Sequence, residues 1–212
     1  MRPYSSSTSP PAKSQRSRRL ASRRQPAWLV LGTLFLSVSA AAGGAAPARP
    51  VIAILSTLPE AAASRAYASA FRSVGYPVRW VTPEVLADIE GPVLVVPLAG
   101  SATLDRESCR RIVSFVEGGG RLVTAGDSPL TRALGVRFAR RHLTIRGVRE
   151  ASAPALRIRW SSPGTLRTYV TPAPARVFAR TPDGRHALVS AFPRGRGLVL
   201  LLGLDLAEED SP

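Results

Sequence analysis

GPVLVVPLAGSATLDRESCRRIVSFVEGGGRLVTAG, residues 91–126, decides the fold, because it predicts one complete strand, helix and strand. Val93 to Pro97 is a short apolar run bounded by Gly-Pro and Gly-Ser pairs, which is typical of a strand covered on both faces. Arg121 to Ala125 is a second run of this kind. Because parallel strands need a crossover of about a dozen residues, the stretch predicts a βαβ unit of an open α/β sheet.

The helix of this unit has recognisable signals at both ends. Its apolar stripe follows the spacing i, i+3, i+4 and i+7 through Cys109, Ile112, Val113 and Val116. Asp105 is placed to cap the free amides of the first turn, and Gly118 to Gly120 are placed to end the helix with a left-handed cap. Cys109 lies on the inward stripe, so we expect this thiol to be inert packing.

The chain is strongly basic, but its charge is unevenly spread. Its 212 residues carry 29 Lys and Arg against 14 Asp and Glu, a formal net charge of +15. Residues 1–46 hold 7 of these bases and no acid, so the other 22 Arg and 14 acids leave +8. Because the arginines are scattered and no aromatic residues interleave them, we expect no nucleic-acid partner. A single cysteine excludes an internal disulfide and a Cys-rich metal site.

Residues 1–46 predict a basic leader with an export signal, ahead of a domain over residues 47–212. Residues 1–26 are rich in Ser, Pro and Arg, and residues 27–46 form an apolar core with a small-residue exit. This order is typical of a signal cleaved near Ala42 or Ala46, by the general rather than the twin-arginine route. The alternative is an uncleaved membrane anchor. The polar end of the chain leaves open a domain that continues beyond Pro212.

The rest of the domain combines helical and strand periods. Strands are expected over residues 51–55 and 78–81, with helices over 63–74 and 82–89, and a brief helix from Ser128 to about Leu134. Residues 143–148 and 156–160 then predict strands with one wet face. Residues 177–181 and 186–192 flank a strong hairpin turn, and Leu198 to Gly203 reads as an interior strand. We therefore predict an α/β, flavodoxin-like three-layer sandwich with a mainly parallel sheet and a C-terminal β-hairpin extension.

Polar side chains in three loops form a candidate ligand pocket. In doubly wound sheets, ligands bind beyond the carboxyl ends of the strands, which here are followed by loops at residues 56–59, 98–103 and 126–129. These loops offer Ser56, Ser101, Asp127 and Ser128. The alternative role of Asp127 is structural, namely hydrogen bonds to the free amides of the following helix.

No catalytic or cofactor motif accompanies this pocket. The sequence contains no GxSxG or GxCxG elbow. We expect His142 on a strand surface and His186 beside a hairpin turn rather than as catalytic bases. Gly118 to Gly120 follow a helix, the reverse of a phosphate loop. We predict no catalytic residue, no cofactor and no metal.

Five arginines follow the brief helix, at Arg137, Arg140, Arg141, Arg146 and Arg149. The first three are candidate anion contacts, and the group has the charge to bind an anionic wall polymer. The alternative is a solvated strand face.

The segments LVVPLAGSATLDRESCRRIVSFVEGGGRLVTAGD (94–127) and DGRHALVSAFPRGRGLVLLLGLDL (183–206) resemble the class I glutamine amidotransferase-like superfamily. More closely, the chain is similar to non-catalytic members in secreted bacterial proteins and in the trimerisation domain of some β-galactosidases. The shared features are Pro97, Phe115-Val116, Gly119-Gly120-Arg121-Leu122, Gly195-Arg196-Gly197 and Gly203-Leu204-Asp205. Amidotransferases carry a cysteine on the elbow after the strand corresponding to Leu122–Ala125. This chain has Gly126-Asp127-Ser128 there, so the resemblance implies the fold without glutaminase chemistry.

We therefore expect an exported or envelope-tethered module without catalysis, with an accessory or interaction role. The carbohydrate or cell-envelope context is implied by the resemblance alone. Its expected partner is a cell-envelope polysaccharide or a partner enzyme chain, with membrane contact only through an uncleaved N-terminal segment. The alternative is part of a polysaccharide hydrolase, of deacetylase or glycosidase type, whose catalytic region lies outside this chain.

Overall fold

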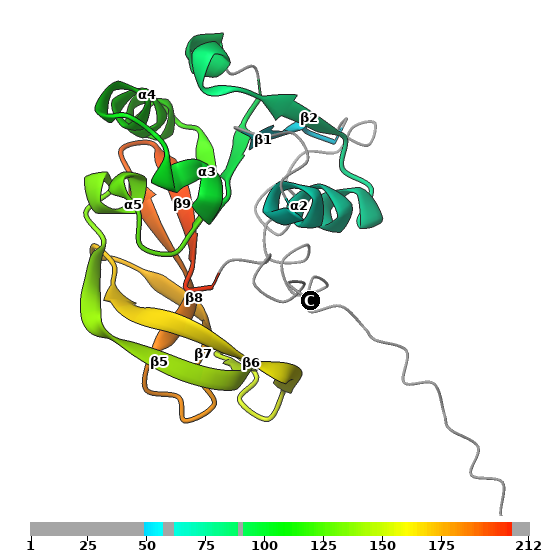
Figure 1. Ribbon diagram of the computed structural model, residues 1–212, viewed down its shortest axis with the longest axis vertical. Helices are drawn as coiled ribbons and strands as arrows, with labels where there is room; N and C mark the ends of the chain where they lie inside the picture. Colours follow the sequence, from blue (N-terminus) through cyan, green and yellow to red (C-terminus); the bar gives the residue numbers. More distant parts are fainter. Residues whose placement is uncertain (1–48, 57–61, 89–90, 205–212) are drawn as a thin grey trace, which may run out of the picture.

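The computed structural model describes residues 49–56, 62–88 and 91–204. Its strands form one nine-stranded mixed sheet (Figure 1). The predicted leader and signal lie outside these ranges. The parallel strands are β1 (Ile52–Leu55), β2 (Val78–Val81), β3 (Val93–Val96), β4 (Arg121–Ala125) and β9 (Gly197–Leu202). The antiparallel strands are β5 (Arg137–Glu150), β6 (Arg157–Val170), β7 (Arg176–Arg180) and β8 (Ala187–Arg194).

The strand order is β2-β1-β3-β4-β9-β8-β7-β5-β6. All pairs from β2 to β9 are parallel, and all pairs from β9 to β6 are antiparallel. The sheet therefore has a parallel half and an antiparallel half that meet at β9. This central place confirms the prediction that β9 is an interior strand.

Helices cover both faces of the parallel half. The α-helices are α2 (Ala62–Ser73), α3 (Leu98–Ala102), α4 (Arg106–Glu117) and α5 (Pro129–Ala133), with the 3-10 helix η1 at Pro83–Asp88. On one face, Tyr67 of α2 belongs to the same buried cluster as Val123. On the other, Ile112 of α4 and Leu130 of α5 belong to the cluster of Leu122. Because side chains alternate along a strand, adjacent residues of β4 contribute to opposite cores.

The central βαβ unit forms as predicted. Asp105 is the N-cap of α4, and its side chain accepts a hydrogen bond from the Ser108 amide at 2.7 Å. Cys109 is buried in the core between α4 and the sheet. The left-handed residue that releases the chain after α4 is Gly119, with φ +118°, whereas Gly118 keeps a helical φ of −71°. Glycine is favoured there because a Cβ is strained at that φ.

Two predictions are corrected. Residues 98–103 are not a simple loop, because Leu98–Ala102 form α3, and the Thr103 hydroxyl donates to the Gly100 carbonyl at 3.0 Å just after it. The second correction concerns the antiparallel strands. β6 does not stop near Trp160 but continues through Pro163-Gly164 to Val170, because a register shift against β5 between Ile145 and Gly147 accommodates the irregularity. The antiparallel part is therefore larger than a C-terminal hairpin.

Candidate functional site

A cavity of about 340 Å³ lies where the two halves of the sheet meet. The parallel half contributes residues at the carboxyl ends of β3, β4 and β9, and β5 and β6 contribute other lining residues. The lining residues are Leu98, Gly126, Asp127, Arg132, Phe138, His142, Thr165, Leu166, Arg167, Gly203 and Leu204. The carboxyl ends of parallel strands are the usual ligand side of such sheets, so this cavity is the candidate site.

Asp127 holds two arginines at this site. Its side chain is 9% exposed. Arg132 of α5 donates to both carboxylate oxygens, from Nε to Oδ1 at 2.8 Å and from Nη2 to Oδ2 at 3.0 Å. Arg167 of β6 donates from Nη1 to Oδ2, and its Nε donates to the Ala139 carbonyl at 2.9 Å. Asp127 therefore ties β6 of the antiparallel half to the β4–α5 turn.

The ion pair with Asp127 also shifts the pKa of Arg132, the more exposed of the two arginines. Hydrogen bonding to Asp127, followed by the charge of that carboxylate, raises the pKa of Arg132 above its ordinary value. Three guanidinium N–H groups donate to the two oxygens of Asp127, so few of its lone-pair sites are left for another donor.

The turn that carries Asp127 depends on its two neighbours. Gly126 adopts φ +63°, and a Cβ at this position would lie 2.8 Å from a methyl carbon of Leu98. Ser128 is the N-cap of α5: its hydroxyl accepts from the Thr131 amide at 3.2 Å, and its own amide donates to the Thr131 hydroxyl at 2.9 Å. The amide-capping role that we considered for Asp127 is therefore filled by Ser128, and the Asp127 carboxylate instead has a structural role in pairing with Arg132 and Arg167.

The wall from β5 and β6 combines an aromatic surface with basic groups. His142 stands directly opposite Arg167 in the strand pairing, and Phe138 stands opposite Tyr169. The Phe138 and Tyr169 rings are 5.8 Å apart at 53°. Tyr169 is buried, its hydroxyl accepts from Ser190 at 3.2 Å, and burial raises its pKa. The tyrosine therefore acts as a neutral support behind Phe138.

The four predicted pocket residues have different positions. Asp127 lines the cavity, whereas Ser56, Ser101 and Ser128 do not line it. All three serines are buried, and the Ser101 hydroxyl donates to the Leu98 carbonyl at 2.9 Å inside α3. Ser101 and Ser128 thus shape the ends of α3 and α5, next to cavity residues Leu98 and Asp127.

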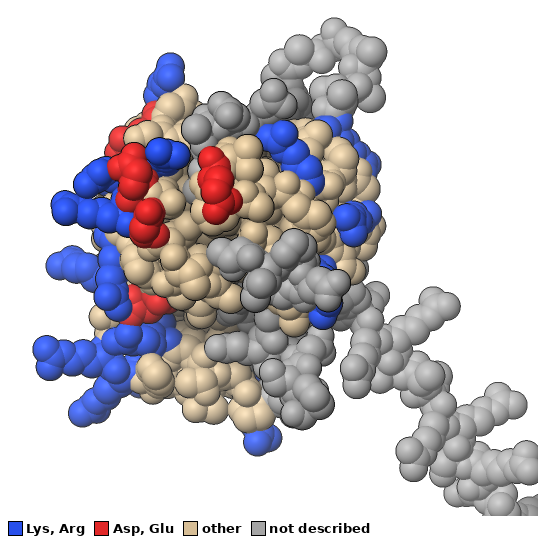
Figure 2. Space-filling model, turned by 45° about the horizontal axis from the view of Figure 1, so that its top comes forward, with Lys and Arg blue, Asp and Glu red and all other residues tan. Residues whose placement is uncertain are grey.

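The three predicted anion contacts lie on β5, outside the cavity lining. Arg137, Arg140 and Arg141 are exposed residues of β5 and do not line the cavity. Figure 2 shows basic side chains gathered along one side of the molecule, with acidic ones interspersed near α4. Because they are exposed and lie outside the cavity lining, the three arginines are open to solvent and to large partners rather than to a ligand in the cavity.

Cys109, His142 and His186 lie in different parts of the molecule. Burial and, to a smaller extent, the Asp105 charge raise the pKa of the Cys109 thiol, which disfavours the reactive thiolate. His142 is exposed at the cavity, whereas His186 belongs to the β7–β8 turn, where its amide donates to the Thr181 hydroxyl at 3.1 Å. Within the described ranges, no three His, Cys, Asp or Glu residues are grouped to hold a metal.

The cavity residues that the sequence did not assign to the site include Arg132, Phe138, His142 and Arg167. Arg132 lies five residues after Asp127, and this spacing on a short helix was an available signal. Arg167 lies forty residues after Asp127, and its contact depends on how β6 pairs with β5. No local pattern reports such a pairing.

Every helix in the described ranges is too short or too polar to span a bilayer.

Comparison with known proteins gives a likeness of fold. No family model and no curated protein matches the chain. A catalytic mutant of Gan42B, a GH42 β-galactosidase from G. stearothermophilus, matches with a TM-score of 0.57 and 16% identity. The match covers 72% of this chain and 27% of that enzyme, so the chain spans about a quarter of the enzyme's length.

Two further solved structures are also similar to this chain in fold. The β-galactosidase from Bacillus circulans sp. alkalophilus matches with a TM-score of 0.55 and 14% identity, over 73% of this chain and 28% of that one. The cytoplasmic protein STM1381 of Salmonella typhimurium LT2 matches with a TM-score of 0.52 and 11% identity, over 75% of this chain and 89% of that one. At these identities the likeness shows the fold alone.

Proposed function

We propose that this chain is an exported, non-catalytic member of the amidotransferase-like proteins, with an accessory or interaction role in carbohydrate or cell-envelope metabolism. In this proposal the domain is a flavodoxin-like three-layer sandwich. The order β2-β1-β3-β4-β9 supports it, because flavodoxin-like sheets have the order 2-1-3-4-5 when the strands are numbered along the chain. The fold likeness to part of GH42 β-galactosidases supports the carbohydrate context.

The observation that supports the proposal most directly is the pairing of the Asp127 carboxylate with two arginines. The resemblance places a catalytic cysteine of amidotransferases at this elbow. Here the elbow carries a carboxylate whose two oxygens accept from Arg132 and Arg167. A base or nucleophile needs an available lone pair, and three charge-assisted hydrogen bonds oppose that availability. The elbow is therefore suited to hold the cavity wall rather than to attack a substrate.

The cavity suits the binding of a small polar ligand. The half-buried Leu98 and Phe138 offer apolar surface, and His142, Thr165 and the arginines offer hydrogen-bonding groups. Ligand pockets commonly combine a mainly apolar lining with a few polar groups that fix orientation. A sugar has both an apolar face and hydroxyl groups, so we propose a saccharide unit as the ligand.

A turnover assay tests the non-catalytic role. The purified chain and Asp127→Asn are compared on chromogenic glycosides, acetylated sugars and glutamine. We expect no turnover above background from either protein. A rate that scales with protein concentration and falls by orders of magnitude in folded Asp127→Asn would contradict the proposal, because it would show that this carboxylate takes part in turnover. Glu107→Gln, an exposed site in α4, is the control for nonspecific effects.

The second candidate function is part of a polysaccharide hydrolase whose catalytic region lies outside this chain. The coverage of 27% of a β-galactosidase favours it, because a fold of this kind occurs there within a larger enzyme. The DNA that follows the codon for Pro212, and co-purification of a partner enzyme, distinguish this candidate from an independent module.

A further inference from the structure

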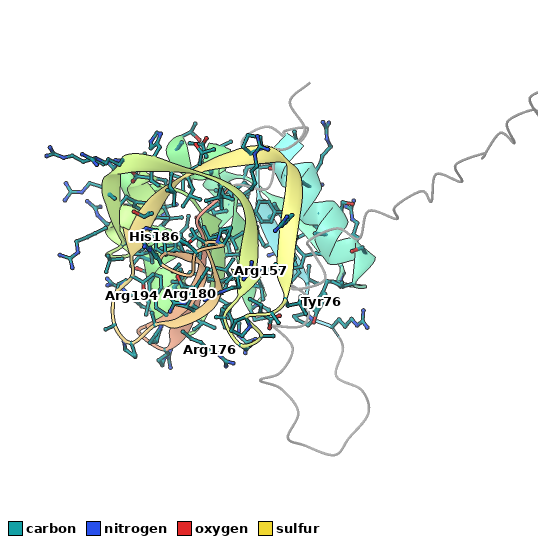
Figure 3. All side chains as sticks on the ribbon, turned by 90° about the horizontal axis from the view of Figure 1, so that it is seen from below. Tyr76, Arg157, Arg176, Arg180, His186 and Arg194 are labelled. Carbon is teal, nitrogen blue, oxygen red and sulfur yellow. The ribbon has the colours of Figure 1, made fainter. Side chains whose placement is uncertain are left out.

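Three arginines form a row across the antiparallel half of the sheet. Arg149 of β5 is directly opposite Arg157 of β6 on one side and Arg180 of β7 on the other. Directly opposed residues of antiparallel strands project from the same face, and neighbouring strands lie about 4.8 Å apart. The three guanidinium groups therefore belong to one face. Figure 3, seen from below, labels Arg157 and Arg180, and the strand pairing places Arg149 between them.

This row, Arg149, Arg157 and Arg180, has no acidic partner among the described residues. The ion pairs of the described part hold other arginines, at positions 110, 111, 132, 167, 185 and 194. The adjacent acids are already engaged: Glu150 accepts from Ser152, and Asp183 accepts from Thr181 and the Arg185 amide.

The row is also accessible. Arg157 is exposed, and Arg149 and Arg180 are half-buried. Arg159, two residues along β6 and opposite Gly147, extends the positive charge on the same face. Like charges placed directly opposite each other destabilise a sheet. A row that opposes folding and faces solvent is suited to a partner that supplies the missing negative charge.

We propose that this row binds an extended glycan that carries one carboxylate per sugar unit. A guanidinium group pairs with a carboxylate through two parallel hydrogen bonds, which suits arginine better than lysine. The spacing of the strands is close to the length of one sugar unit in an extended chain. Single-stranded nucleic acids are bound by basic grooves with aromatic stacking platforms, and the row has arginines alone. The choice of a glycan among polyanions rests on the proposed function.

The test compares two triple variants with the same loss of charge. One is Arg149→Gln, Arg157→Gln and Arg180→Gln, and the control is Arg137→Gln, Arg140→Gln and Arg141→Gln, at exposed sites of β5 outside the row. Binding of the full chain to immobilised polygalacturonate is measured at low and high salt, with neutral dextran and single-stranded DNA as further probes. We expect polygalacturonate affinity to fall roughly tenfold in the row variant and less than about twofold in the control. High salt should weaken binding of the unmodified chain.

Four outcomes overturn the inference. The first is no binding of polygalacturonate, and the second is an equal loss of affinity in the two triple variants. The third is tighter binding of single-stranded DNA than of polygalacturonate, and the fourth is binding of neutral dextran as tight as that of polygalacturonate. Thermal unfolding gives an independent readout. Because the row variant loses like-charge repulsion, we expect its melting temperature to be equal or higher, and a clear drop would assign the row a structural role instead. Turnover in the assay above would contradict the proposed function and leave this binding result standing, so the two failures are distinguishable.

Discussion

The parallel and antiparallel halves of this sheet differ in how many of their strand residues are buried. In the parallel half, all residues of β1 and β3 are buried, because helices cover both faces. In the antiparallel half, β5 mixes buried positions such as Ile145 with exposed arginines. The first half therefore concentrates the hydrophobic free energy of folding, and the second presents charge to solvent. The cavity lies where they meet, so a stable scaffold and a polar surface each contribute one wall.

The largest expected effect is on the core of the parallel half. Leu122→Ala removes a fully buried side chain of β4, and we expect the free energy of unfolding to fall by about 3 kcal/mol. Leu143→Ala is the matched change in the antiparallel half, where the side chain is only half-buried, and we expect a loss of about 1 kcal/mol. Denaturant unfolding measures both. Equal losses would show that the two halves contribute equally to stability and would contradict the comparison.

An intermediate effect is expected at the junction. Asp127→Asn removes the charge that holds Arg132 and Arg167, and we expect a loss of about 2 kcal/mol in unfolding free energy. Most of it should come from Arg167, because the Arg132 side chain is 66% exposed and its pair is screened by water.

A double-mutant cycle separates these contributions. The coupling energy between Asp127→Asn and Arg167→Gln should exceed that between Asp127→Asn and Arg132→Gln. Glu107→Gln, which breaks exposed pairs in α4, is the control with an expected loss below about 0.5 kcal/mol. A junction without energetic coupling would give additive losses in both cycles.

The smallest effect is expected from a helix cap under acid. The Ser108 amide, first, and the Ser108 side chain lower the pKa of Asp105 below its ordinary value. Because the folded state has the lower pKa, the stabilisation is complete above the unfolded pKa of about 3.9 and is lost as the pH falls through the folded value.

Asp105→Asn keeps a capping oxygen but removes this titration. We expect the denaturation midpoint of the unmodified chain to exceed that of the variant slightly at pH 7, and the two to converge near pH 2. Asp183→Asn provides the comparison in the antiparallel half, because hydrogen bonds from Thr181, first, and from the Arg185 amide lower the pKa of Asp183 as well. Curves that remain parallel from pH 7 to pH 2 would show that the carboxylate charge of Asp105 does not contribute.

The local sequence was a good guide to the parallel half. Asp105, the glycines after α4 and the apolar stripe through Cys109 each act within a few residues, so their signals are readable one segment at a time. The antiparallel half was predicted less well. The length of β6 and its register against β5 depend on pairing between residues that are distant in the chain, and Pro163-Gly164 disguised the continuity.

The candidate site divides in the same way. Asp127 was identified because it follows a buried strand at the ligand side of the sheet, which is a local observation with a general physical reason. Its partner Arg167, the Phe138 wall and the position of His142 at the cavity were not identifiable, because each depends on the β5–β6 pairing. The arginine row was also hidden, since Arg149, Arg157 and Arg180 meet only through strand register.

The amino-acid sequence by itself determined which segments become the helices and strands of the parallel half and which turn carries Asp127, because hydrophobic period, capping residues and glycine conformation act over short distances. Only the tertiary structure decided that the carboxylate is held by Arg132 and Arg167, and that three arginines stand in one row. The physical reason is that sheet register joins residues far apart in the chain, and no local energy term specifies which of them will meet.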